Sequence, residues 1–148
     1  MKRIIAFVIA VIMAATVLTA CKSETLTVYK PGNNAAEASR AELLYPECNG
    51  SYDGIEAYTL KDNDAWKLFD YVRTLCVAEN KTDSMEKSEH LIHMLFTAEW
   101  NKQRVDLGVY QIYDSGVISR SESSYSSNIE LYTCPSDAFD KIRDMVKK

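Results

Sequence analysis

The first long apolar stretch of the chain lies at its N-terminus. Residues 4–20 are apolar except for two threonines, and Lys2 and Arg3 precede them. A membrane-spanning helix needs roughly 20 consecutive apolar residues, whereas a short basic region followed by a shorter apolar one is typical of a secretory signal peptide. We therefore predict that residues 1–20 are a cleaved signal peptide, with an uncleaved anchor helix as the alternative.

Two later segments have the spacing of apolar residues that is expected of amphipathic helices. In residues 63–78 and in the segment after Pro135, apolar side chains recur every three or four positions. Asp62 is well placed as the N-cap of the first helix, and Asp137 and Lys141 are spaced as an i,i+4 ion pair in the second. The apolar positions are Ala65, Leu68, Phe69, Val72, Leu75 and Cys76 in the first helix, and Phe139, Ile142, Met145 and Val146 in the second.

Alternation of apolar and polar residues predicts strands in the rest of the C-terminal part. Residues 90–100 place Ile92, Met94 and Phe96 on one face, and turn-like sequences separate the alternating segments that follow. The result is an antiparallel meander sheet with the two amphipathic helices packed on one face, which is an α+β fold. The predicted strands are residues 55–60, 90–100, 105–113, 117–120 and 129–133.

The segment after the signal peptide has weaker patterns. Residues 25–29 are compatible with a short strand, and residues 35–44 are rich in good helix formers before Pro46. We expect residues 21–50 to be a tether that contains this strand and this helix. Residues 51–148 would then form a single small α+β domain, since the 128 residues that remain after cleavage suit one domain.

The end of the apolar stretch carries a processing motif. Leu18, Thr19, Ala20 and Cys21 are an aliphatic residue, two small residues and a cysteine. This segment resembles the lipobox of bacterial lipoproteins, and the resemblance covers only the first 23 residues. It implies cleavage before Cys21, acylation of the Cys21 thiol, and anchoring of an extracytoplasmic domain to the cell membrane, or to the outer membrane of a host with two membranes. Two acyl chains hold a protein stably, whereas one holds it only marginally.

The charge of the mature chain limits its partners. Cleavage removes Lys2 and Arg3 and no acidic residue, which leaves 15 basic against 21 acidic side chains and a formal charge of −6. Nucleic acid is therefore not an expected partner, because binding it needs a clustered basic face. We also expect the acidic body to avoid flat contact with an anionic lipid surface and to stand off on its tether.

The remaining cysteines and the histidines match no cofactor or metal motif, so we expect no cofactor. Three cysteines lie beyond the acylated one, without C-x-x-C spacing. We expect Cys76 to be an inert buried thiol, and a disulfide, if one forms, to join Cys48 and Cys134. His90 and His93 would point to opposite faces of a strand, where they cannot share a metal ion.

Two residue patterns raise the question of catalysis. Ser84 to Lys87 spells the S-x-x-K of β-lactamases and penicillin-binding proteins, but no K-T-G follows, and the chain is too short for those enzymes. Glu99 and Asp106, near a predicted hairpin, would suit a hydrolase of envelope glycans if they faced each other across a cleft. This paired-carboxylate hydrolase is the alternative functional hypothesis. A thiol-based factor that uses the remaining cysteines is a third.

The nine tyrosines and a serine-rich loop favour recognition over catalysis. Tyrosine supplies a large, stiff contact area with a hydroxyl at its tip. Residues 119–128 combine Arg120 and Tyr125 with many hydroxyl groups, a composition that is favoured in recognition loops. Tyr110 and Tyr113 lie in the predicted strand 105–113. These four side chains are the candidate partner contacts. The leading hypothesis is a noncatalytic lipoprotein that binds an envelope protein, peptide or glycan, as an inhibitor, an immunity factor or an accessory subunit.

Overall fold

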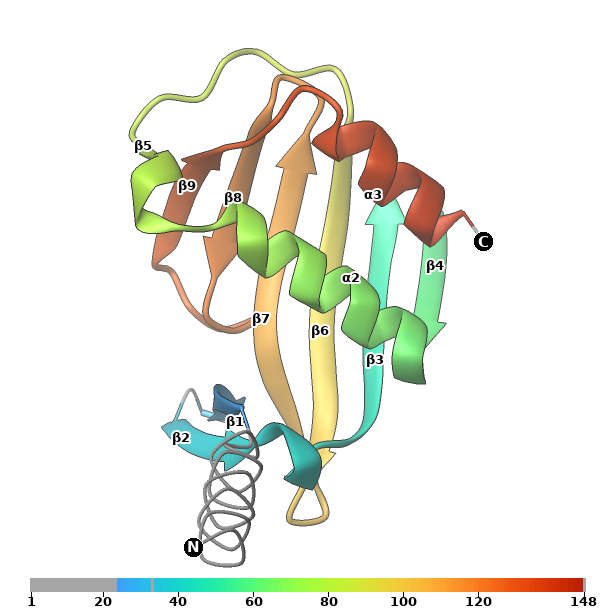
Figure 1. Ribbon diagram of the computed structural model, residues 1–148, viewed down its shortest axis with the longest axis vertical. Helices are drawn as coiled ribbons and strands as arrows, with labels where there is room; N and C mark the ends of the chain where they lie inside the picture. The colour runs from blue at the N-terminus through green and yellow to red at the C-terminus, as the bar shows by residue number, and fades with distance from the viewer. Residues whose placement is uncertain (1–23, 33, 148) are drawn as a thin grey trace, which may run out of the picture.

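The chain folds around one large antiparallel sheet (Figure 1). The computed structural model describes residues 24–32 and 34–147, so the predicted signal peptide and Cys21 lie outside the described residues. The strands are β1 (Thr25–Lys30), β2 (Asn34–Ser39), β3 (Leu44–Tyr52), β4 (Glu56–Lys61), β5 (Lys81–Thr82), β6 (Leu91–Trp100), β7 (Gln103–Tyr113), β8 (Val117–Ser121) and β9 (Ile129–Thr133). The helical segments are η1 (Arg40–Glu42), α2 (Asp62–Leu75), η2 (Ala78–Asn80) and α3 (Ala138–Val146).

The predicted antiparallel meander and the α+β class are confirmed. The sheet order is β4-β3-β6-β7-β8-β9-β5, so β6 to β9 pair in the order of the sequence. The β3–β4 hairpin extends the sheet beyond β6, and the β1–β2 hairpin joins β7 where Tyr29 pairs with Asp106. The two-residue strand β5, which pairs with β9, lies outside the strands predicted from the sequence.

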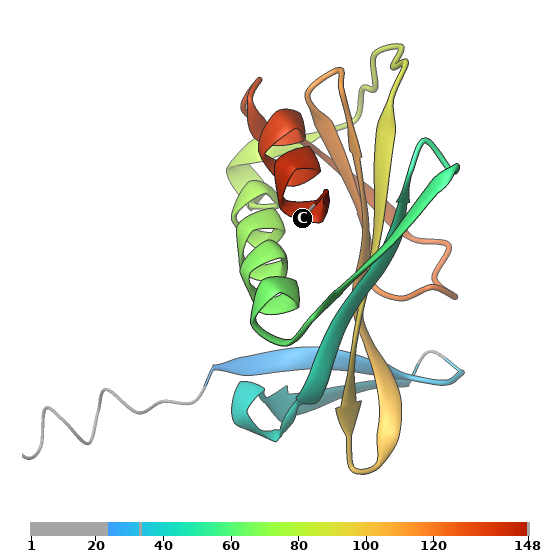
Figure 2. The ribbon, with the colours of Figure 1, turned by 90° about the vertical axis from the view of Figure 1, so that its right-hand side faces the viewer.

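A cluster of aromatic rings marks the place where α2 meets the sheet. The ring centroid of Phe69 in α2 lies 5.1 Å from that of Phe96 in β6 and 6.5 Å from that of Tyr110 in β7. In α3, the side chains of Phe139 and Ile142 are buried at the predicted spacing. Figure 2 shows both helices on the same side of the sheet. Removal of these apolar surfaces from water is the main driving force for this packing.

The helix expected at residues 35–44 is wrong. Residues 34–39 form β2, which pairs along its whole length with β1, and only the short η1 follows. The pairing with β1 satisfies backbone groups of this alanine-rich segment and buries Ala38 against the core. These tertiary contacts outweigh the small intrinsic preference of alanine for a helix. The short strand predicted at residues 25–29 is confirmed as β1.

The sheet also begins earlier in the sequence than expected. β3 starts at Leu44 and runs between β4 and β6, and its Cys48 is fully buried. The boundary expected at residue 51 therefore lies inside a strand. The described residues of 24–50 belong to the folded unit and not to a tether.

The start of α2 differs from the prediction in its capping. Asp62 is the first residue of the helix, Lys61 occupies the N-cap position, and no side-chain cap hydrogen bond forms. Because β4 leads into α2 without a loop, Asp62 makes the turn itself, with a φ of 51°. In α3, the predicted ion pair between Asp137 and Lys141 forms at 2.7 Å.

Candidate binding site on the open face of the sheet

A cavity of about 230 Å³ lies between β6–β9 and the loop that follows β8, residues 122–128. Phe96 of β6 contacts α2, so the alternating side chains of His93 and Leu95 point away from the helix and line the cavity. We call this side of the sheet the open face. Figure 2 shows the loop on the side of the sheet away from the helices.

The floor of the cavity carries a row of polar side chains that crosses three strands. His93 of β6 lies opposite Gln111 of β7, which in turn lies opposite Ser119 of β8. Residues that lie opposite each other in an antiparallel pair share a face, so these three side chains stand side by side. Burial lowers the pKa of His93, and its imidazole is therefore neutral at pH 7.

The next row of the floor is mainly apolar. Leu95, Val109, Ser121 and Ile129 lie opposite one another across β6, β7, β8 and β9. The side chain of Ile129 is exposed at the mouth of the cavity. A ligand in the cavity would meet an apolar strip directly beside a polar one.

The loop that covers the floor is held by its own serines. Asp106 of β7 accepts hydrogen bonds through Oδ2 from the backbone N–H of Ser124 at 3.0 Å and from its hydroxyl at 2.7 Å. The hydroxyl of Ser121 donates to the carbonyl oxygens of Ser123 and Ser126, at 3.1 and 3.3 Å. These bonds tie both sides of the loop to the sheet, so the cavity is formed before any ligand binds.

Polar groups of the floor keep unused hydrogen-bonding capacity. Burial is the only influence on the pKa of His93, and its ring bonds to no described residue. The side-chain oxygen of Gln111 accepts a hydrogen bond from the hydroxyl of Tyr113 at 2.7 Å. That bond fixes the orientation of the amide and leaves its NH₂ group available as a hydrogen-bond donor. The floor therefore offers both a donor and an acceptor within one row.

The lining of the cavity is uncharged, and its histidine is not paired with Ser119. The lining contains no acidic, lysine or arginine side chain. His93 and Ser119 are separated by β7, hence by roughly 9–10 Å, because neighbouring strands lie about 4.8 Å apart. A histidine base must reach its serine nucleophile by a hydrogen bond, and this spacing prevents it. Within the described ranges, no cluster of three or more His, Cys, Asp or Glu side chains could hold a metal ion.

The structure does not bring the four predicted contact residues together. Tyr110 is only 2% exposed and packs against Phe69 and Phe96, so it belongs to the core. Arg120 lies opposite Tyr110 and therefore faces the helix side. Both are corrections to the prediction, and their cause is the two-residue period of the strands, which separates them from the open face.

Tyr113 and Tyr125 lie closer to the cavity. Tyr113 shares the open face with Gln111, to which it donates, and Tyr125 projects from the covering loop with 72% of its surface exposed. Sequence analysis missed the row formed by His93, Gln111 and Ser119. The alternation that places each of them on the open face was visible, but the strand register that aligns them was not.

The three described cysteines are unpaired, so the disulfide considered between Cys48 and Cys134 is wrong. Cys48 lies in β3 and Cys134 follows β9, and three strands separate β3 from β9 in the sheet. Burial raises the pKa of Cys48 and of Cys76 to about 12, and that of Cys134 to about 11. Thiols with such pKa values are poor nucleophiles.

The carboxylates of the alternative hypothesis lie on neighbouring strands. Asp106 is engaged by Ser124, whereas Glu99 lines a shallow hollow with Tyr45 and Arg104. Asp106 is not among the residues that line this hollow. His90 precedes β6 and forms an ion pair with Asp53 at 2.7 Å, away from His93.

Comparison with known proteins adds no relative. No family model, no curated protein and no solved structure matches the chain. Among the described residues, no helix combines the length and the apolar character needed to cross a bilayer.

Proposed function

We propose that the protein is an extracytoplasmic lipoprotein, anchored through Cys21, whose domain binds a partner in the cell envelope without catalysis. The observation that carries the binding role is the cavity on the open face, with its polar row of His93, Gln111 and Ser119 beneath a loop anchored to Asp106. The lipobox-like sequence that ends at Cys21 supports the anchor.

In this proposal, α2 and α3 act as one layer that closes the other face of the sheet. Their buried stripes support this role, because an amphipathic helix is stable only where its apolar side is covered. The open face is then the side that is left for a partner.

The lining defines the kind of group that the cavity accepts. Because it carries no formal charge at pH 7, an uncharged polar group fits it better than a carboxylate, a phosphate or an amine. The volume suits a single side chain or sugar unit, since cavities for whole small molecules are typically 300–1,000 Å³. The partner is therefore an envelope protein, peptide or glycan that presents such a group.

The test is photo-crosslinking in intact cells with a benzophenone amino acid at Tyr125, beside the cavity. A probe at Met85, which is 50% exposed in the loop after β5, is the control. We expect one dominant adduct from position 125 and none of that mass from position 85. Identical adduct patterns from the two positions would refute a specific partner at the cavity.

A second variant links the adduct to the cavity itself. Ser119→Leu places an apolar side chain in the polar row and is expected to abolish the adduct from position 125. Ser127→Leu changes an exposed serine of the same loop outside the lining and should leave the adduct intact. An adduct that survives Ser119→Leu would show that the partner binds elsewhere.

A further inference from the structure

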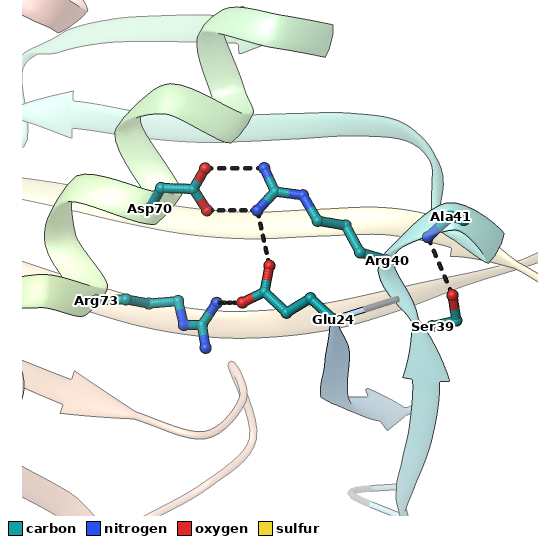
Figure 3. A network of polar contacts seen from close by, with 6 residues as sticks. All are labelled: Glu24, Ser39, Arg40, Ala41, Asp70 and Arg73. Atoms are coloured by element: carbon teal, nitrogen blue, oxygen red, sulfur yellow. Dashed lines mark hydrogen bonds and ion pairs between the residues drawn. The ribbon is translucent and has the colours of Figure 1, made fainter. Parts of the chain in front are cut away.

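The first described residue of the chain is clamped to α2. Glu24 accepts hydrogen bonds from Arg40 of η1 at 3.0 Å and from Arg73 of α2 at 2.5 Å (Figure 3). Arg40 also forms a two-point ion pair with Asp70 of α2, at 2.7 and 2.8 Å. We call this alternating chain of charges, Asp70–Arg40–Glu24–Arg73, the N-terminal clamp.

The clamp is more than a single surface ion pair. The guanidinium of Arg40 lies 4.2 Å from the ring centroid of Trp66, so it is stacked as well as paired. Both arginines hold the carboxylate of Glu24, and they lower its pKa through these hydrogen bonds. Two-point arginine–carboxylate pairs fix geometry as well as charge. The start of β1 is therefore held in one position against α2.

The clamp leaves little slack between the domain and the proposed anchor. Only Lys22 and Ser23 separate Cys21 from Glu24. Three steps of an extended chain span at most about 11 Å between Cα atoms. An acylated Cys21 would therefore hold the clamped end of the domain at the bilayer surface, and the expectation that the domain stands off on a tether of some 30 residues does not hold.

The same end of the domain exposes two apolar side chains. Leu44 and Tyr45, just after η1, are 51% and 70% exposed. Tyr45 adopts a φ of 49°, a left-handed conformation that costs a residue other than glycine some free energy. Tyrosine and aliphatic side chains are favoured where water meets the acyl region of a bilayer. Figure 1 shows this end of the molecule, with the β1–β2 hairpin and η1, opposite the loop that follows β5.

We propose, on the basis of the acylation of Cys21 proposed above, that Leu44 and Tyr45 insert into the interface of the phospholipid bilayer and that the N-terminal clamp sets this orientation. The short link from Cys21 to Glu24 would bring this end of the domain to the bilayer surface. The apolar side chains exposed at this end are Leu44 and Tyr45. The N-terminal clamp contacts α2, on the face of the sheet opposite to the cavity.

The test uses the full acylated chain, reconstituted in vesicles of phosphatidylcholine and phosphatidylglycerol. Spin labels at Tyr45→Cys and at Met85→Cys report their depth through relaxation by oxygen, which concentrates in lipid, and by a water-soluble nickel chelate. Both sites are exposed, so the substitutions leave the core intact, and labelled parent protein gives the background from the native cysteines. We expect oxygen to dominate at position 45 and the nickel chelate at position 85.

Variants of the clamp complete the test. Glu24→Gln is expected to reduce the oxygen-to-nickel ratio at position 45 by at least twofold, because it weakens both arginine contacts. Glu37→Gln, an exposed change on β2 outside the clamp, should leave the ratio unchanged. An unchanged oxygen-to-nickel ratio in Glu24→Gln would show that the N-terminal clamp does not set the orientation of the domain on the membrane.

The outcomes separate the orientation from the anchor. Acylated protein that floats with vesicles but shows equal nickel access at positions 45 and 85 would overturn the docked orientation and leave the anchor standing. Protein that carries no acyl mass and does not float would overturn both.

Discussion

Asp106 accepts two hydrogen bonds from Ser124, so a carboxylate of β7 holds the loop that covers the cavity. The sequence alone makes Asp106 a candidate for catalysis, but in the fold it supports the wall of a binding site. The charge remains at the edge of the cavity and outside its lining, which keeps the lining neutral. These two hydrogen bonds predict that residues 122–128 are well ordered only while the Asp106 carboxylate is present.

Replacement of Asp106 should loosen the loop without unfolding the sheet. In Asp106→Ala, the amides of residues 122–128 are expected to exchange with solvent at least tenfold faster, and the crosslink from position 125 should weaken. The free energy of unfolding should fall by about 1 kcal/mol, the usual loss for such hydrogen bonds. Hydrogen exchange by mass spectrometry measures this, with Asp83→Asn, an exposed change elsewhere, as control. Unchanged exchange in the loop would contradict the anchoring role.

Gly50 of β3 should tolerate no side chain. A Cβ atom there would collide with the backbone oxygen of His93 and with the hydroxyl of Tyr58, which donates to that same oxygen at 2.7 Å. Because a backbone atom cannot move aside cheaply, Gly50→Ala should lower the free energy of unfolding by about 3 kcal/mol. Urea denaturation measures the loss, and Ser51→Ala on the same strand should change it by less than about 1 kcal/mol. A similar, small effect of both variants would contradict this packing.

The two histidines should give stability opposite dependences on pH. The hydrogen bond with Asp53 raises the pKa of His90 above 6.5, so its contribution is full below pH 6.5 and is lost as pH rises through the raised pKa. Burial lowers the pKa of His93 below 6.5, so its folded environment is most favourable above pH 6.5 and becomes costly as pH falls through that value.

Urea midpoints between pH 5 and 8 separate the two effects. His90→Gln should be destabilised most at pH 5 and least at pH 8. His93→Gln should gain stability relative to the parent as the pH falls toward 5. Parallel pH profiles for the two variants would show that the assigned partners are wrong.

The N-terminal clamp should contribute to stability as well as to orientation. Arg40→Ala removes its pairing with Asp70 and Glu24 and its stacking on Trp66, and the free energy of unfolding is expected to fall by about 1–2 kcal/mol. Arg40→Lys keeps the charge but loses the two-point geometry, so we expect it to recover less than half of that loss. Arg143→Ala, a half-buried arginine of α3 that pairs with Asp140 alone, is the matched control and should cost less than about 1 kcal/mol. Equal losses in Arg40→Ala and Arg143→Ala would indicate that the clamp is not a strong network.

The thiols should be free but unreactive. Without reductant, the folded protein is expected to react slowly with a thiol reagent such as Ellman's, because burial raises the pKa values of Cys48, Cys76 and Cys134. After denaturation, the protein acylated at Cys21 should release three equivalents, one for each remaining cysteine. Rapid reaction in the folded state would revive a thiol-based function, and only one equivalent after denaturation would reveal a disulfide.

Local periodicity explains why much of the fold was predictable. The alternation that ends in Trp100 and the three- and four-residue spacing around Phe69 are properties of a single segment, and β6 and α2 follow them. The segment around Ala38 shows the limit of this reasoning. Its composition favours a helix, but pairing with β1 and burial of Ala38 outweigh that preference. Information about β1 is not contained in the segment itself.

The sequence by itself determined the strands of the meander, the two helices, the acidic charge and the lipobox-like end of the apolar stretch at Cys21. Only the tertiary structure decided that His93, Gln111 and Ser119 form one row, because strand register depends on contacts between residues that are far apart in the chain. Register also placed Tyr110 in the core and Asp106 at the covering loop. The type of a residue sets the interactions that its side chain can form. The register of the strands determines which residues are close enough to form them.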